Sequence, residues 1–209
     1  FMSQDVQAWL DDGFLDDLAA NIDMGKALAW PVPTKPGDTI WMGAIDADGR
    51  AVSFIQSIFW EYGSGVVVPE TGVLWQNRGH GFTLDAEHPN VLAPGKRPFH
   101  TLNPAMASLN DGTVLSYGTM GGEGQPQTQA AVFARYAFFQ QRLQESVTAP
   151  RWLLGRTWGE ESTTLKVESR FEPTLVQQLR EAGHTIDMMD AFNSTMGHAG
   201  AVALRPNGV

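Results

Sequence analysis

Thr39 has the residue type and the position that nucleophilic catalysis needs. It lies in Gly37-Asp-Thr-Ile-Trp41, after a proline-rich stretch and before an apolar run. A hydroxyl becomes a nucleophile when a base takes its proton, and a free α-amine, with a pKa of about 7.7–8.0, can be that base near neutral pH. Cleavage before Thr39 would give one residue both groups. The alternative is a β-branched residue placed on a sheet, because threonine is common in strands.

The segments around Thr39 predict a hairpin preceded by a cleavable linker. Apolar runs at 40–46 and 50–58 flank the turn Asp46-Ala-Asp-Gly49, which is typical of a β-hairpin. The segment Ala27–Gly37 carries three prolines within six residues and cannot continue a helix. We therefore expect an exposed linker directly before Thr39.

The remaining patterns predict a layered α+β domain, because strands, then a helix, then further strands follow one another. Residues 5–29 read as two helical pieces interrupted by Asp11-Asp-Gly13. Further helices are expected at 127–144 and 173–182, a long loop at 79–98, and strands or short apolar runs at 66–68, 73–75, 105–109, 113–117, 163–168, 186–189 and 200–204.

Composition excludes several classes of function. The 209 residues are 43% hydrophobic with a net charge of −9 and scattered Lys and Arg, so we expect no nucleic-acid partner. The absence of cysteine excludes disulfides and thiolate chemistry. No apolar run approaches a membrane span, and no signal peptide is visible, so we expect no membrane and favour a cytoplasmic over a periplasmic location. His80 and His88 lack metal-site spacing, so we expect no metal and no cofactor.

A series of short motifs links Thr39 to one known family. In order along the chain they are Thr39, Asp46-x-Asp-Gly49-x-Ala-Val52, Gly63-Ser-Gly65, Glu70-Thr-Gly72-Val-Leu74, Gln76-Asn77, Lys96-Arg-Pro98, Asn103-Pro104, Tyr117-Gly-Thr-Met-Gly-Gly122 and Ala149-Pro-Arg151. From Thr39 to about Arg170 the chain resembles the small subunit of the γ-glutamyltranspeptidase family. Each motif is common alone, but their order and spacing over more than a hundred residues are specific.

The resemblance implies an N-terminal nucleophile hydrolase, an αββα sandwich completed by a missing large subunit. Residues 1–38 would be the tail of that subunit and the processing linker, and 39–209 the catalytic small subunit, in a heterodimer or a dimer of heterodimers. The resemblance also implies that Gly121 and Gly122 supply oxyanion-hole amides, and that Ser57 hydrogen-bonds the amine of Thr39. The alternatives are a tight turn for the glycines and a strand-end serine.

The chain departs from the family where a γ-glutamyl substrate would be held. Phe59, Arg78 and Gly81 occupy positions where Asn, Gln and Asp are expected, and His100 and Thr101 replace paired serines. Without the Asp, a substrate ammonium loses its natural partner. An arginine fork suits a planar carboxylate instead, and His100 could be a donor beside it. The alternatives are a structural arginine and a hydrogen-bonded loop histidine.

These departures resemble the oxamate amidohydrolase branch of the family, so a small acid amide such as oxamate is the expected substrate. Other readings stay open. The protein could be a true γ-glutamyltransferase or glutathione hydrolase, or a cephalosporin-acylase-like enzyme with a wide apolar pocket. It could also be an inactive, unprocessed fragment that needs its partner half. Among the tryptophans, Trp75 is expected nearest a site, because it adjoins Gln76 and Arg78.

Overall fold

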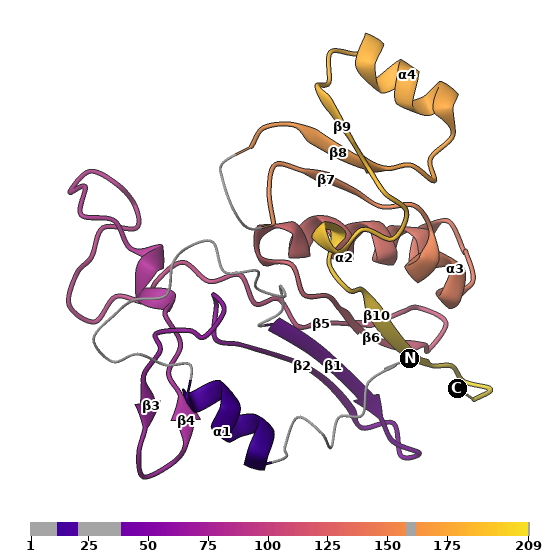
Figure 1. Ribbon diagram of the computed structural model, residues 1–209. Coiled ribbons are helices and arrows are strands. Elements are labelled where there is room, and N and C mark those ends of the chain that lie inside the picture. Colours follow the sequence, from indigo (N-terminus) through magenta and orange to yellow (C-terminus); the bar gives the residue numbers. More distant parts are fainter. Residues whose placement is uncertain (1–11, 21–38, 158–161, 209) are drawn as a thin grey trace. The chain divides into compact units, whose positions relative to one another are not determined.

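The computed structural model describes residues 12–20, 39–157 and 162–208 (Figure 1). Its strands are β1 (Thr39–Ile45), β2 (Ala51–Ser57), β3 (Val67–Val68), β4 (Val73–Leu74), β5 (Ala105–Ser108), β6 (Val114–Gly118), β7 (Trp152–Leu154), β8 (Leu165–Glu168), β9 (Ile186–Met189) and β10 (Gly200–Leu204). Its α-helices are α1 (Asp12–Ala20), α2 (Gln125–Phe133), α3 (Leu143–Thr148) and α4 (Pro173–Glu181). Shorter turns are the 3₁₀ segments Arg78–Gly81, Gly122–Gly124 and Ser194–Met196 and the π-helical Ala134–Phe138.

Strand β1 begins at Thr39 and forms an antiparallel hairpin with β2. The register pairs Thr39 with Ser57 at the open end and Ile45 with Ala51 at the turn. The Asp46 carboxylate closes the turn by accepting the amides of Asp48 and Arg50. The hairpin is therefore found within one residue of its predicted bounds.

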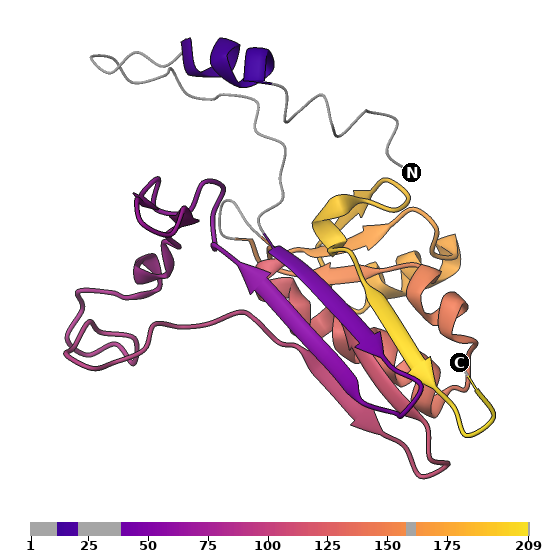
Figure 2. The same ribbon diagram turned by 90° about the horizontal axis from the view of Figure 1, so that it is seen from below.

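The hairpin packs face to face on a second antiparallel sheet of order β10-β6-β5, which Figure 2 shows from below. Trp41 fills the space between the sheets. A β-carbon on Gly43 would lie 2.5 Å from its indole, one on Gly200 would lie 2.7 Å away, and one on Gly118 would overlap it. The indole nitrogen donates to the Ser53 hydroxyl over 2.9 Å. The sheets can approach closely here because these three positions carry no side chain.

Helices cover the other face of the β10-β6-β5 sheet. Helix α2 contacts β6, and α3 contacts β10. Beyond α2 lies a third sheet of order β7-β8-β9, in which α4 connects the parallel strands β8 and β9 (Figure 1). The predicted α+β class is confirmed, with two facing sheets and a helical layer on one side.

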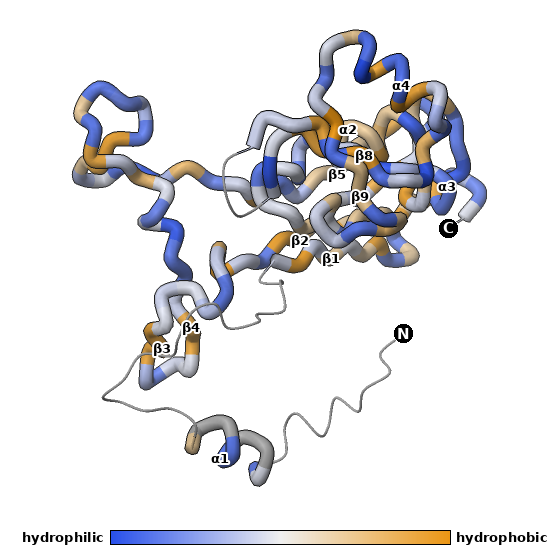
Figure 3. Tube along the Cα trace, turned by 45° about the horizontal axis from the view of Figure 1, so that its top comes forward, coloured by the Kyte–Doolittle hydropathy of each residue, from blue (hydrophilic) through white to orange (hydrophobic). Residues whose placement is uncertain are grey.

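The outer face of the hairpin is apolar and exposed. Strand alternation turns Trp41 and Ile55 inward and leaves four large apolar side chains outside, at Ile40, Met42, Val52 and Phe54. Figure 3 shows the hydrophobic stretches along β1 and β2. Antiparallel sheets commonly expose a polar outer face, so an apolar one indicates a surface made to be covered.

The predicted helix 127–144 is wrong as one element. It ends at Phe133, continues as a π-turn, and is interrupted where Gln140 adopts a left-handed φ of 54° before α3 begins. Phe139, which falls inside the predicted helix, is 73% exposed. Apolar periodicity ran on across the break, because no glycine or proline marks it.

The N-terminal region also differs from expectation. Gly13, expected to separate two helical pieces, lies within α1. The other predicted helical residues of 5–29, the linker 27–37 and the Asp38–Thr39 junction lie outside the described residues. By its contacts the chain divides into two units, 1–36 and 37–209.

Candidate active site

The hydroxyl of Thr39 meets the hydroxyl of Ser57 at the head of the hairpin. Thr39 Oγ1 donates to Ser57 Oγ over 2.8 Å, which the register of β1 and β2 makes possible. The resemblance implied a bond from Ser57 to the Thr39 amine, whereas this bond joins the two hydroxyls. The hairpin therefore anchors the candidate nucleophile by the oxygen that would react.

Ser57 is itself held by the backbone of Phe59. The Phe59 amide donates to Ser57 Oγ over 2.9 Å, a local turn in which a serine hydroxyl accepts the amide two residues ahead. Phe59 has a φ of 80°, in the region that bulky residues rarely adopt. Such a conformation costs on the order of 1–3 kcal/mol and persists only where surrounding contacts impose it.

Arg78 is the buried cation of this region. Its side chain and backbone are only 4% exposed, and its guanidinium lies 4.6 Å from the centre of the Phe59 ring. Nη1 donates to the hydroxyl of buried Thr101 over 2.9 Å, and the backbone amide of Arg78 donates to the Gln76 side chain. The structure thus brings together Phe59, Arg78 and Thr101, three of the predicted binding residues.

His100 lies at the edge of the same cluster and is solvent-exposed as a residue. Its Nδ1 accepts the Leu102 amide over 3.3 Å. Partial desolvation, followed by the positive charge of Arg78, lowers the pKa of the imidazole. A neutral ring whose Nδ1 accepts carries its proton on Nε2, so His100 can offer one donor beside Arg78.

Trp60, rather than Trp75, is the tryptophan in contact with Phe59. Its ring stacks on Phe59 at 5.8 Å and tilts against His80 at 4.1 Å, while its amide donates to Asn77 Oδ1 over 3.1 Å. Trp75, the tryptophan predicted to be near the site, is 55% exposed at the end of β4. Adjacency to Phe59 was the available signal for Trp60.

Gly121 and Gly122 form a tight turn between β6 and α2. Their φ angles are 126° and 47°, which glycine alone adopts readily. A β-carbon on Gly122 would lie 2.5 Å from the Thr157 carbonyl oxygen, and one on Gly121 would lie 3.4 Å from Gly197. The backbone of both residues is therefore enclosed by neighbouring main chain.

The segment 193–197 packs behind this turn, and three side chains donate hydrogen bonds to its carbonyl groups. Thr128 Oγ1 donates to the Met196 carbonyl over 3.1 Å, Thr157 Oγ1 donates to the Thr195 carbonyl, and Arg151 donates to the Gly197 and Asn193 carbonyls. In the sequence, Arg151 is part of the motif Ala149-Pro-Arg151, which by itself predicts no role for its side chain.

Arg151 is in turn oriented by a buried carboxylate. Glu168 is fully buried and accepts from Arg151 over 2.8 Å and from Arg170. Burial by itself would raise the pKa of Glu168, but the hydrogen bonds from the two arginines outweigh it and hold that pKa below its ordinary value. An ionised glutamate therefore sits between two cations beneath the segment 193–197.

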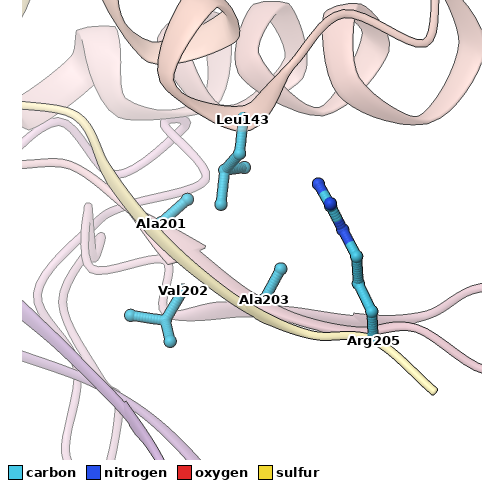
Figure 4. A pocket seen from close by; sticks show the side chains of 5 residues that line it. All are labelled: Leu143, Ala201, Val202, Ala203 and Arg205. Carbon is cyan, nitrogen blue, oxygen red and sulfur yellow. The ribbon is translucent and has the colours of Figure 1, made fainter. Parts of the chain in front are cut away.

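A pocket of about 250 Å³ lies on the helical face of the β10-β6-β5 sheet, as Figure 4 shows; it is lined by Leu143, Ala201, Val202, Ala203 and Arg205. Gly200 meets Trp41 on the opposite face, so this pocket does not adjoin the hairpin. Within the described ranges no group of three or more His, Asp or Glu could hold a metal ion. None of the helices described has the length and apolarity of a bilayer-spanning segment.

Comparison with known proteins gives the family. The family model for gamma-glutamyltranspeptidase matches residues 1–209. The chain belongs to the γ-glutamyltranspeptidase family. This family consists of enzymes, and the expected membership is thereby confirmed.

Two curated relatives in the γ-glutamyltranspeptidase family are similar to nearly the whole of this chain. The chain is 57% identical over 205 residues to the oxamate amidohydrolase proenzyme of Klebsiella pneumoniae, covering 98% of this chain and 39% of that protein. It is 43% identical over 205 residues to the glutathione hydrolase-like YwrD proenzyme of Bacillus subtilis, covering 97% and 38%. The chain thus spans about two fifths of the length of these curated relatives.

The fold agrees with a solved member of the wider group. The cephalosporin acylase from Bacillus halodurans superposes with a TM-score of 0.66 at 33% identity, covering 99% of this chain and 37% of that one. The predicted N-terminal nucleophile hydrolase fold is thereby confirmed for this γ-glutamyltranspeptidase family member.

Proposed function

We propose that this chain carries the catalytic part of an autoprocessed N-terminal-threonine amidohydrolase that hydrolyses a small acid amide such as oxamate. One observation carries the proposal: a chain of direct contacts leads from the Thr39 hydroxyl through Ser57 and Phe59 to the buried guanidinium of Arg78. A nucleophile and a carboxylate-binding cation therefore belong to one connected cluster. Its compactness suits a substrate whose carboxylate is close to the scissile bond.

The chemistry needs only this chain's groups once Thr39 has a free amine. The amine takes the hydroxyl proton as Thr39 Oγ1 attacks the amide carbonyl, and the tetrahedral intermediate then expels ammonia after protonation by the same amine. Water hydrolyses the resulting threonine ester, with the amine again acting as the base. For oxamate the acyl group is oxalyl, so the products are oxalate and ammonia.

Gly121 and Gly122 are proposed to stabilise the oxyanion. Gly43 lies beside Ser116, and Trp41 lies beside Gly118. Two residues back along β1 therefore correspond to two residues forward along β6. A further step of two residues leads to Thr39 on one sheet and to residue 120, directly before the glycine turn, on the other. Backbone amides presented by that turn would then lie near the reacting carbonyl, where such donors are worth most.

Arg78 is proposed to bind the substrate carboxylate, with Thr101 and His100 as neighbouring donors. A guanidinium offers in-plane donors that match a carboxylate, and at 4% exposure little water competes. Gly81 provides no carboxylate for a substrate ammonium. The name of the 57% identical relative, an oxamate amidohydrolase, supports the same substrate class.

The partner is proposed to be the large subunit of the same proenzyme. Residues 1–38 would be its tail and the processing linker, and residues 39–209 the small subunit, in a heterodimer or a dimer of heterodimers. The exposed apolar side chains of Ile40, Met42, Val52 and Phe54 support a covering layer outside the hairpin. That layer would complete the αββα sandwich, and a cytoplasmic location is proposed for the assembly.

A panel assay of the full-length, processed protein tests the proposal. It compares oxamate, a γ-glutamyl anilide and a glutaryl amide, with the products identified. We expect hydrolysis of oxamate to exceed that of the other two. A preference for the γ-glutamyl compound would overturn the substrate but leave the threonine mechanism, and no turnover of any amide would overturn both.

A further inference from the structure

We infer that Phe59 is a positioning residue that couples carboxylate recognition at Arg78 to the nucleophile. This rests on the proposed function of the same site. The ring of Phe59 supports the guanidinium at 4.6 Å, and its amide holds the Ser57 hydroxyl at 2.9 Å. One residue thus touches both the cation and the partner of Thr39.

The backbone of Phe59 makes this double contact possible. Ser57 and Phe59 are two residues apart, so in an extended strand their side chains would share one face and the Phe59 amide would not turn back. The φ of 80° sets the direction in which the Phe59 ring leaves its own amide, so the ring reaches Arg78 while the amide stays bonded to Ser57 Oγ. The strain is thus located where the two contacts diverge.

The opposing segment fixes this conformation. The Asn77 amide donates to the Ile58 carbonyl over 3.2 Å, and Asn77 Oδ1 accepts the Trp60 amide over 3.1 Å. Trp60 then stacks on Phe59 from outside. The residues on either side of Phe59 are therefore clamped to Asn77, which directly precedes Arg78.

The stacked ring has a consequence for specificity. It covers one face of the Arg78 guanidinium, so an incoming carboxylate binds in the plane of the cation through its edge donors. In oxamate, the monoamide of oxalic acid, the carboxylate carbon is bonded directly to the scissile carbonyl carbon. A rotation of the guanidinium plane would therefore displace the carbonyl from Thr39, and the ring prevents it.

The test uses the processed full-length enzyme with oxamate and oxamide, a pair of similar size that differs in the carboxylate charge. Phe59→Leu removes the aromatic face, Phe59→Tyr retains it, and Phe139→Leu makes the same change at an aromatic residue that is 73% exposed in another part of the fold. We expect Phe59→Leu to lower the oxamate-to-oxamide ratio of kcat/KM about three- to thirtyfold, chiefly through the KM for oxamate. Phe59→Tyr should keep the wild-type ratio, and Phe139→Leu should not alter it.

If Phe59 had a merely structural role, Phe59→Leu would lower kcat/KM equally for oxamate and oxamide. The ratio would then be unchanged, and the inference would be overturned. Oxalate binding by calorimetry to wild type, Phe59→Leu, Arg78→Ala and the double variant gives an independent measure. We expect Phe59→Leu to weaken oxalate binding in the wild type and to add nothing once Arg78 is gone. If oxamate and oxamide are not hydrolysed, the proposed substrate fails, and the oxalate cycle alone decides. Additive losses, or no oxalate binding by wild type, would overturn the coupling.

Discussion

The Thr39 hydroxyl donates a 2.8 Å hydrogen bond to the Ser57 hydroxyl across the open end of the β1–β2 hairpin. This bond joins the first residue of one strand to the last residue of the other. The oxygen proposed to attack the substrate is therefore positioned by sheet pairing, whose register seven residue pairs define. A loop would not hold it to the same precision.

Replacement of Thr39 tests the nucleophile directly. Thr39→Ala in the full-length protein should abolish both self-cleavage and amide hydrolysis, because the variant has no hydroxyl to attack either bond. Thr39→Ser is the matched control and should retain both activities at a reduced rate. Gel electrophoresis measures cleavage, and ammonia release measures turnover. Substantial turnover by Thr39→Ala would refute the assignment.

Uncleaved protein should be catalytically silent toward amides. While residue 38 remains bonded to Thr39, the nitrogen is an amide and cannot accept the hydroxyl proton. After cleavage, kcat/KM should rise with pH as the amine loses its proton, with a midpoint near its ordinary pKa of about 7.7–8.0. Mass spectrometry establishes the cleavage state. Hydrolysis by protein shown to be intact would contradict the amine-as-base mechanism.

Removal of the Arg78 side chain should reduce activity on carboxylate substrates selectively. A charge-assisted pair contributes on the order of 1.5–3 kcal/mol, so Arg78→Ala should lower kcat/KM for oxamate roughly ten- to a hundredfold. A neutral anilide should be affected much less. Equal losses on both substrates would point to a structural arginine.

Position 81 offers the reverse experiment. A β-carbon on Gly81 would lie 3.4 Å from the Phe99 carbonyl oxygen, a tight contact that a small adjustment relieves. Gly81→Asp should therefore be accommodated and should increase relative activity on γ-glutamyl compounds by supplying a partner for the ammonium. The ratio of kcat/KM for the two substrates measures this. An unchanged ratio would mean that Phe59 alone excludes the amino group.

Gly122→Ala should damage catalysis through the backbone. The added β-carbon would meet the Thr157 carbonyl oxygen at 2.5 Å, so the turn must move. Loss of one oxyanion donor typically costs about 10²–10³ in kcat. Gly72→Ala is the matched control, because Gly72 also has a positive φ, of 66°, but open space around its β-carbon. Wild-type kcat in Gly122→Ala would remove this turn from the proposed oxyanion hole.

Glu168→Gln should lower stability and alter its dependence on pH. Removing one partner from a buried ion cluster costs about 3–5 kcal/mol, because the arginines lose their compensating charge. The folded-state pKa of Glu168 is depressed, so its stabilisation is complete above the ordinary value of 4.5 and is lost as pH falls through the folded value. Urea unfolding at several pH values should show this acid loss in wild type and not in Glu168→Gln. If the free energy of unfolding changed with pH in the same way in both proteins, the predicted contribution of Glu168 would be contradicted.

The sequence predicted those features that local patterns determine. Alternating apolar residues and the Asp-x-Asp-Gly turn placed the hairpin, and hairpin geometry brought Ser57 back to Thr39. Strands 186–189 and 200–204 were found as predicted. In each case spacing along the chain and a turn signal determine the structure, so no distant contact is needed.

Contacts between distant segments were not predictable. The residues next to Phe59 in the sequence do not predict its left-handed φ, because the hydrogen bonds that fix this conformation come from Asn77. Arg151 reaches the segment 193–197 only after three strands and α4 have packed. The interruption before α3 likewise lies at Gln140, whose left-handed φ no glycine or proline signals. These features follow from tertiary packing and override local pattern.

The placement of Trp41 over Gly43, Gly118 and Gly200 has a consequence for how this chain can diverge. Those glycines come from three strands far apart in the sequence, yet each is small because of one indole. A side chain at any of them would become acceptable only after position 41 had shrunk. A smaller residue at position 41 alone would leave a void between the sheets. The four positions are therefore coupled, and substitutions at them are expected to appear together in descendants of this sequence.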